Sequence, residues 1–160
     1  MFDKRFIQND WYKNMESGLE SISNFERKVP SQEVFESICE TILGLDPNIR
    51  FAGVINNKGK LLARCIKTGI RSFTTQHDRE MLLMETALGI RMRKEHDSNL
   101  GPMIFTISYD DKMISMNFPM NDEILCVSAE KKINLMTLPF LILKFLKVNL
   151  DKNTKHDKRL

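Results

Sequence analysis

The sequence predicts an α+β domain with the order α-β-β-α-β-β-β-α, a five-stranded antiparallel sheet and an extra N-terminal helix. Apolar residues recur at spacings of three and four in several segments, which is the period of a helix face. Short apolar runs come in one group of two and one of three, separated by turns rich in Asn, Asp and Gly, as in antiparallel hairpins. The 160 residues fit one domain.

The first helix is predicted over residues 11–28, where Asp10 can cap it and Pro30 follows its end. Apolar residues at spacings of three and four form a stripe of five large side chains along this helix. Such a stripe must be covered by this chain's sheet, by a dimer mate or by a partner. We interpret it as a partner-binding surface on an N-terminal helical extension, residues 1–30. The stripe consists of Trp11, Met15, Leu19, Ile22 and Phe25.

The remaining elements form the main domain, which we assign to residues 31–150. Ser31 can cap a helix that ends near Gly44. The strands are expected over residues 50–55, 60–65, 103–108, 113–118 and 123–128. Thr75 and Asp78 resemble a capping box that opens a long helix running to about His96. A last helix spans about 137–150, with Pro139 in its first turn.

The long helix carries two apolar stripes, and this is its informative feature. Leu83, Ala87 and Ile90 form one stripe, and the other lies roughly 120° away around the helix axis. One stripe suffices to pack a helix on a sheet, so the second indicates another contact. We favour self-pairing across a twofold axis, while the alternative is cover by the N-terminal helix of the same chain. The second stripe consists of Met81, Met84, Leu88 and Met92.

Several segments resemble an uncharacterised archaeal family of roadblock/LC7-like, profilin-like domains over about residues 31–148. They are residues 49–56 and 59–61, 80–82, 91–95, 100–102 and 127–130. The resemblance departs at Ala63-Arg64-Cys65-Ile66, where small residues are expected. It implies a homodimer formed through the long helix and the following strand, which adds Phe105 to the expected interface. It also implies a protein-binding scaffold or regulator whose partner is a small Ras-like GTPase.

No catalytic signature accompanies these segments, so we expect no enzyme, no cofactor and no metal. His77 and His96 lie at opposite ends of the long helix, about 29 Å apart at the helical rise. The acidic pairs Asp110-Asp111 and Asp122-Glu123 fall at hairpin tips, where acidic residues favour turns. A small-ligand sensor is the alternative function, because Gly53 and Gly69 could leave room between sheet and helix.

Cysteine use indicates a cytoplasmic protein, and the charge distribution disfavours a nucleic-acid or membrane partner, with attachment through the basic tail as the alternative. Cys39, Cys65 and Cys126 are distant from one another and lie in apolar runs, as free thiols do in a reducing compartment. The net charge is +3, of which residues 144–160 contribute +4. The folded body is therefore nearly neutral, and we expect residues 151–160 to be a basic disordered tail.

Overall fold

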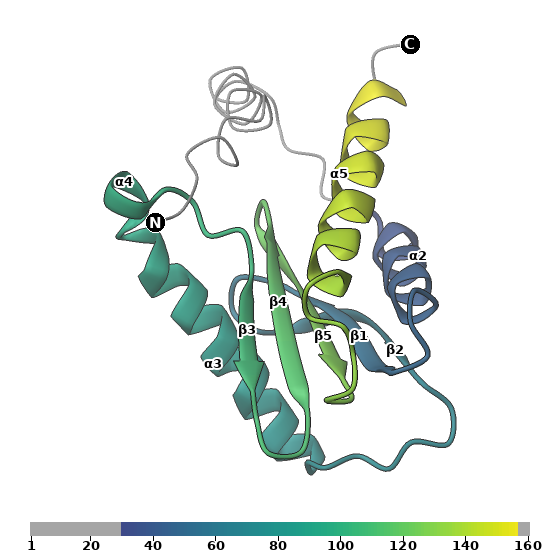
Figure 1. Ribbon diagram of the computed structural model, residues 1–160. Helices are drawn as coiled ribbons and strands as arrows, with labels where there is room; N and C mark the ends of the chain where they lie inside the picture. The colour runs from purple at the N-terminus through teal and green to yellow at the C-terminus, as the bar shows by residue number, and fades with distance from the viewer. Residues whose placement is uncertain (1–29, 157–160) are drawn as a thin grey trace. The chain divides into compact units, whose positions relative to one another are not determined.

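The computed structural model describes residues 30–156 and confirms the predicted fold class (Figure 1). Residues 1–29, including the helix expected over 11–28, lie outside the described residues. The elements are α2 (Gln32–Leu43), β1 (Ile49–Ile55), β2 (Leu61–Ile66), α3 (Gln76–Lys94), α4 (Asp97–Leu100), β3 (Thr106–Tyr109), β4 (Ile114–Met120), β5 (Glu123–Ala129) and α5 (Leu138–His156).

The five strands form one antiparallel sheet in the order β2-β1-β5-β4-β3. Three hairpins are formed by strands that follow each other in the chain, as their short turns predict. The pairing of β1 with β5 joins the two groups and places Gly53 opposite Cys126. Since α3 connects β2 to β3, it carries the chain from one edge of the sheet to the other.

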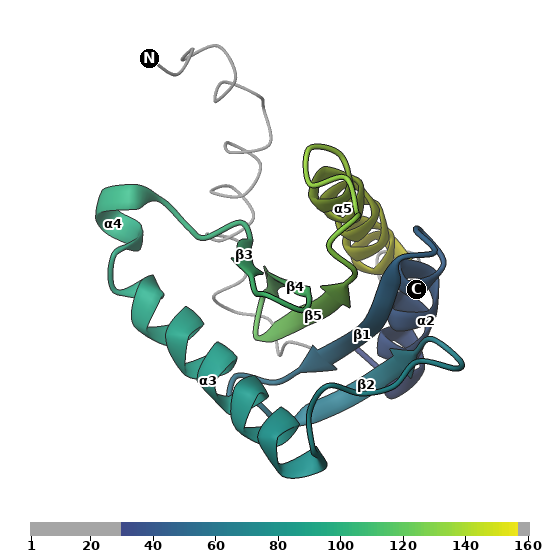
Figure 2. The same cartoon turned by 60° about the horizontal axis from the view of Figure 1, so that its bottom comes forward.

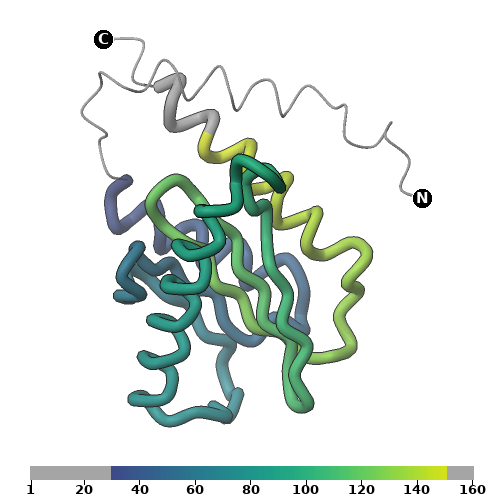
Figure 3. Tube along the Cα trace, turned by 90° about the vertical axis from the view of Figure 1, so that its left-hand side faces the viewer, coloured from purple at the N-terminus to yellow at the C-terminus, as the bar shows by residue number. Residues whose placement is uncertain are grey.

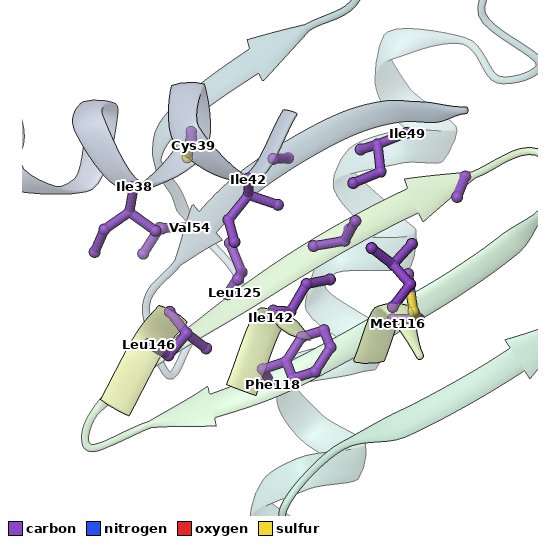
Figure 4. Close-up of a cluster of buried hydrophobic side chains, with 14 of the residues drawn as sticks. Ile38, Cys39, Ile42, Ile49, Val54, Met116, Phe118, Leu125, Ile142 and Leu146 are labelled. Atoms are coloured by element: carbon purple, nitrogen blue, oxygen red, sulfur yellow. The ribbon is translucent and has the colours of Figure 1, made fainter. Parts of the chain in front are cut away.

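One face of the sheet packs against α2 and α5, and the main core lies there (Figure 4). In β4 every second residue points into this core, and Met116 and Phe118 are fully buried. The same alternation that a half-buried strand requires leaves Ser115 and Asn117 on the opposite face. The core side chains labelled in the figure are Ile38, Cys39, Ile42, Ile49, Val54, Met116, Phe118, Leu125, Ile142 and Leu146.

The opposite face of the sheet is covered by α3 (Figures 2 and 3). Its cluster is small: Ala87 and Ile90 of the helix pack with buried side chains of β1 and β5, and Leu83 borders them. The strand residues are Ile55, Ile124 and Cys126. A cluster of this size holds one narrow stripe of the helix and leaves the rest of its circumference uncovered.

One of three predicted helix ends is confirmed, and two differ from the sequence predictions. Thr75 caps α3 as expected, because its Oγ1 accepts a hydrogen bond of 3.1 Å from the Asp78 N–H. Ser31 occupies the N-cap position of α2 in an extended conformation, but its side chain makes no capping hydrogen bond. The backbone of α5 continues to His156, past Leu150, where we expected the helix to end.

The third strand is shorter than predicted at its N-terminal end. We expected it over 103–108, whereas β3 begins at Thr106, whose partner is Asn117. The β3–β4 ladder therefore stops two residues before Pro119, a residue that has no N–H to donate. Met103 and Phe105 precede the strand, and each packs into a different core cluster.

The β1–β2 turn touches the backbone of α3 at Gly59. This glycine has a φ of +83°, and a Cβ placed on it would lie 2.6 Å from the Met84 Cα. The turn and the helix thus approach so closely that no side chain fits between them. Gly69, in the β2–α3 connection, has a similar φ of +78° but nothing within 4 Å of the equivalent point.

These two glycines form a matched pair for a stability test. Gly69→Ala should lower the free energy of unfolding by about 1–2 kcal/mol, the cost of a left-handed alanine. Gly59→Ala should cost that amount plus about 1–3 kcal/mol for forcing α3 away from the turn. Urea denaturation of both variants measures the difference, and equal losses would contradict the close contact.

Candidate functional site

The most exposed apolar surface of α3 is the stripe Met81, Met84, Leu88 and Met92, which we call the α3 outer stripe. The exposed fractions of its four side chains are 52%, 53%, 48% and 63%. The other stripe of the helix faces the sheet, with Ala87 and Ile90 buried. The structure therefore separates the two stripes as the sequence predicted, and in the described part of the chain the α3 outer stripe is open.

Phe105 does not lie with the α3 outer stripe. Its ring centroid is 5.6 Å from that of Phe118 and 5.8 Å from that of Phe140, so it belongs to the face that carries α5. The reason is strand alternation: the ladder that pairs Thr106 with Asn117 places the preceding residue beside Phe118, on the other side of the sheet from α3. Of the five residues predicted as one interface, the four of the α3 outer stripe thus lie together. Phe105 lies apart from them, on the opposite face of the sheet.

Between β2 and the first turns of α3 lies a groove of about 690 Å³, which we call the β2–α3 groove. Leu61, Leu83 and Met84 contribute apolar lining, and Gly59 also lines it. Four cationic side chains and one carboxylate also line it: Lys58, Lys60, Arg64, Arg79 and Glu80. These cations come from a turn, a strand and a helix, so no local sequence pattern identifies them as one site.

Arg50 fixes the connection that leads from β2 into this groove. It is a buried charged residue, and its guanidinium pairs with the Glu130 carboxylate at 2.5 Å. The same guanidinium donates to the Arg71 carbonyl oxygen at 2.8 Å and lies 4.2 Å from the Phe73 ring centroid. A buried charge needs such partners, and here they tie the β2–α3 connection to the end of the sheet.

Two buried cysteines among the described residues have strongly raised pKa values. Burial, with the neighbouring Cys39 thiol, raises the pKa of Cys126 to about 12. Burial, with a contribution from Cys65, raises the pKa of Cys39 to about 11. Both thiols therefore stay protonated at neutral pH, as small apolar core residues would. Among residues 30–150, whose side chains the structure describes, no three His, Cys, Asp or Glu gather closely enough to hold a metal ion.

Three further sequence predictions concern a membrane, the N-terminal partner surface and room for a ligand. None of the helices in the described part is long and apolar enough to cross a membrane. The residues proposed for partner binding, Trp11, Met15, Leu19, Ile22 and Phe25, lie outside the described residues. Gly53 leaves no room for a ligand, because a Cβ there would lie 2.5 Å from the Phe51 ring.

The family DUF6659, described as a family of unknown function, matches residues 29–156. No curated protein sequence matches the chain. Among solved structures, a roadblock/LC7 domain from Streptomyces avermitilis is 9% identical, with a TM-score of 0.55 over 72% of this chain and 96% of that one. The gliding protein MglB from Thermus thermophilus is 15% identical, with a TM-score of 0.62 over 78% and 91%. An MglB structure with a tetrameric arrangement is 14% identical, with a TM-score of 0.60 over 78% and 93%. At these identities the likeness shows a shared roadblock/LC7 fold.

The orientation of α3 can be tested by placing a charge on each of its stripes. Leu88→Glu should leave a folded protein with a cooperative thermal transition, because in the single chain the new carboxylate is exposed to water. Ile90→Glu should unfold the domain or lower its stability by several kcal/mol, since it buries an unpaired charge. Circular dichroism recorded during thermal melting shows whether each variant is folded and how stable it is. Unfolding by Leu88→Glu would contradict this orientation of α3.

Proposed function

The chain belongs to the DUF6659 family of unknown function, and we propose that it is a non-enzymatic, homodimeric protein-binding scaffold or regulator. The observation that carries this proposal is the α3 outer stripe. Four large apolar side chains, each about half exposed, line one side of a helix whose other side is already packed on the sheet. Exposed apolar surface that is contiguous in this way is typical of a protein contact.

The order of residues along α3 favours an antiparallel pair with a second copy of the same helix. Around a twofold axis near residue 86, Met81 lies opposite Met92 of the second copy and Met84 opposite Leu88. The same axis brings Glu80 opposite Arg91 of the second copy, which puts opposite charges beside the apolar seam. A twofold contact must be complementary to itself, and this sequence satisfies that condition.

A protein partner of the small Ras-like GTPase class is the finer part of the proposal. It is supported by the resemblance of the sequence to roadblock/LC7-like domains and by the shared fold. The N-terminal residues Trp11, Leu19 and Ile22, with Met15 and Phe25, are proposed to recognise this partner. The archaeal origin and cytoplasmic location implied by the sequence stay predictions, as does the alternative role of a small-ligand sensor.

The dimer is expected to break when a charge enters the α3 outer stripe. The unmodified protein at micromolar concentration should have the mass of two chains, and Met84→Glu or Leu88→Glu that of one, because each would bury an unpaired carboxylate. Light scattering measures the mass. As a matched control, Met136→Glu changes another exposed apolar residue, which is 81% exposed, and should keep the dimer. A single-chain mass for the unmodified protein at all concentrations would refute the proposal.

The GTPase partner and the N-terminal surface can be tested together. The tagged full chain, mixed with native cytosol, should enrich a small GTPase, and the double variant Leu19→Glu/Ile22→Glu should lose it. Mass spectrometry of both samples, with GDP or a non-hydrolysable GTP analogue added, gives the comparison. Trp11 is the single tryptophan of the chain, so a change in its emission on adding the purified GTPase reports contact with that segment. Equal enrichment by both proteins would contradict the role of the N-terminal residues. Absence of a GTPase from both samples would contradict the proposed partner.

A further inference from the structure

The strand β2 forms one edge of the sheet and, among the described strands, has only β1 as a neighbour. Beyond the end of β2, the Lys67 N–H donates to the Arg50 carbonyl oxygen at 2.9 Å, which identifies this opposed pair as a hydrogen-bonded one. Hydrogen-bonded and non-hydrogen-bonded pairs alternate along an antiparallel ladder. Cys65 therefore bonds to β1, whereas the backbone groups of Arg64 and Ile66 point to the free edge.

The side chains of these two residues lie on the face that carries α3. Arg64 is opposite Gly53 and Ile66 opposite Phe51, and Phe51 packs with the α3 cluster. Both side chains are exposed, Ile66 by 45%. Arg64 also lines the β2–α3 groove. Outward-facing backbone groups, the apolar Ile66 side chain and the cationic groove thus lie together along one edge of the sheet.

The charge of the groove is not balanced from within. Lys58, Lys60, Arg64 and Arg79 line it together with one carboxylate, that of Glu80, which accepts a hydrogen bond from the neutral Gln76 amide. The ion pairs formed among the described residues are Arg50–Glu130 and Arg93–Asp97, and neither involves a groove cation. The groove therefore attracts negative charge.

We propose that β2 accepts an extended acidic segment of a partner protein as an additional strand. The segment pairs antiparallel, as all strands of this sheet do, with an apolar residue opposite Ile66 and an acidic residue two positions later opposite Arg64. Residues two apart on a strand share one face, so both side chains reach the α3 side, where the groove cations surround the carboxylate. The backbone ladder provides affinity, and the side chains at alternate positions provide specificity.

The same residues disfavour pairing of β2 with another copy of itself. Like charges opposite each other in a ladder are destabilising, and two copies of β2 would bring the cations of two grooves together. The edge is therefore closed to itself and open to an acidic strand. This inference rests on the proposed protein-binding role. It uses the free edge of β2, whereas the dimer contact uses the α3 outer stripe, and the two surfaces adjoin at Glu80 and Met84, which also line the groove.

The test measures binding of a fluorescein-labelled peptide, Thr-Val-Thr-Glu-Thr-Glu-Thr, to the full chain by fluorescence anisotropy at physiological salt. Binding should weaken on the order of tenfold or more when both Glu are replaced by Gln, and equally in the protein variant Arg64→Glu. Lys144→Glu on α5 makes the same change of net charge away from the groove and should leave the Kd within about twofold, because distant surface charges are screened.

Backbone methylation separates strand pairing from ionic attraction. N-methylation of the first Glu removes the N–H that would bond to the Arg64 carbonyl oxygen and should abolish binding. N-methylation of the Thr that follows it, whose N–H points away from β2, should be tolerated. Equal effects of the two methyl groups, binding of the Gln peptide as strong as the Glu peptide, or undiminished binding by Arg64→Glu would each overturn the proposal.

Two further measurements distinguish the ways of failing. Inorganic pyrophosphate that binds where the peptide does not would make the groove a small-anion site and refute the strand. Light scattering of the same samples shows whether the dimer is intact. A dimer that binds no peptide would overturn only the acidic-strand inference, and a single chain that binds the peptide through Arg64 would overturn only the dimer.

Discussion

The central strands β1 and β5 are buried on both faces, and this constraint determines what surrounds them. An antiparallel sheet with two apolar faces must be covered twice. Two helices, α2 and α5, cover one face with a large core, whereas α3 covers the other with a small one. Because a small cluster suffices to hold α3, most of the surface of this helix is available for other contacts.

Local sequence patterns predicted the elements that depend on near neighbours. The hairpins follow from their turns, and the two stripes of α3 follow from helical spacing, so their separation into a packed and an open side was predictable. Phe105 shows the limit, because its side of the sheet depends on the register with β4, and a strand read one residue differently exchanges its faces. Arg50 shows another, since its carboxylate partner Glu130 lies 80 residues away in the chain.

The β2–α3 groove could not be predicted for the same reason. Its cations lie in separate elements: Lys58 and Lys60 at the β1–β2 turn, Arg64 in β2 and Arg79 in α3. Each one alone would be an ordinary solvated charge. The close packing of the Gly59 turn on the Met84 backbone, together with the small cluster under α3, brings the hairpin and the helix together. The two edges of the sheet consequently differ in chemistry: β2 borders a cationic groove, whereas β3 exposes Ile107 and Tyr109.

The anchoring of the β2–α3 connection by Arg50 has a thermodynamic consequence for the groove beside it. A connection of residues 67–75 that was fixed only at its ends would let the start of α3 sample many positions relative to β2. Holding the Arg71 carbonyl oxygen and the Phe73 ring divides it into two shorter loops, each with fewer accessible conformations. The entropy of positioning the groove walls is then lost during folding, and a ligand that enters finds them already in place. In this sense the ion pair of the buried Arg50 with Glu130, neither of which lines the groove, acts as a preorganising element.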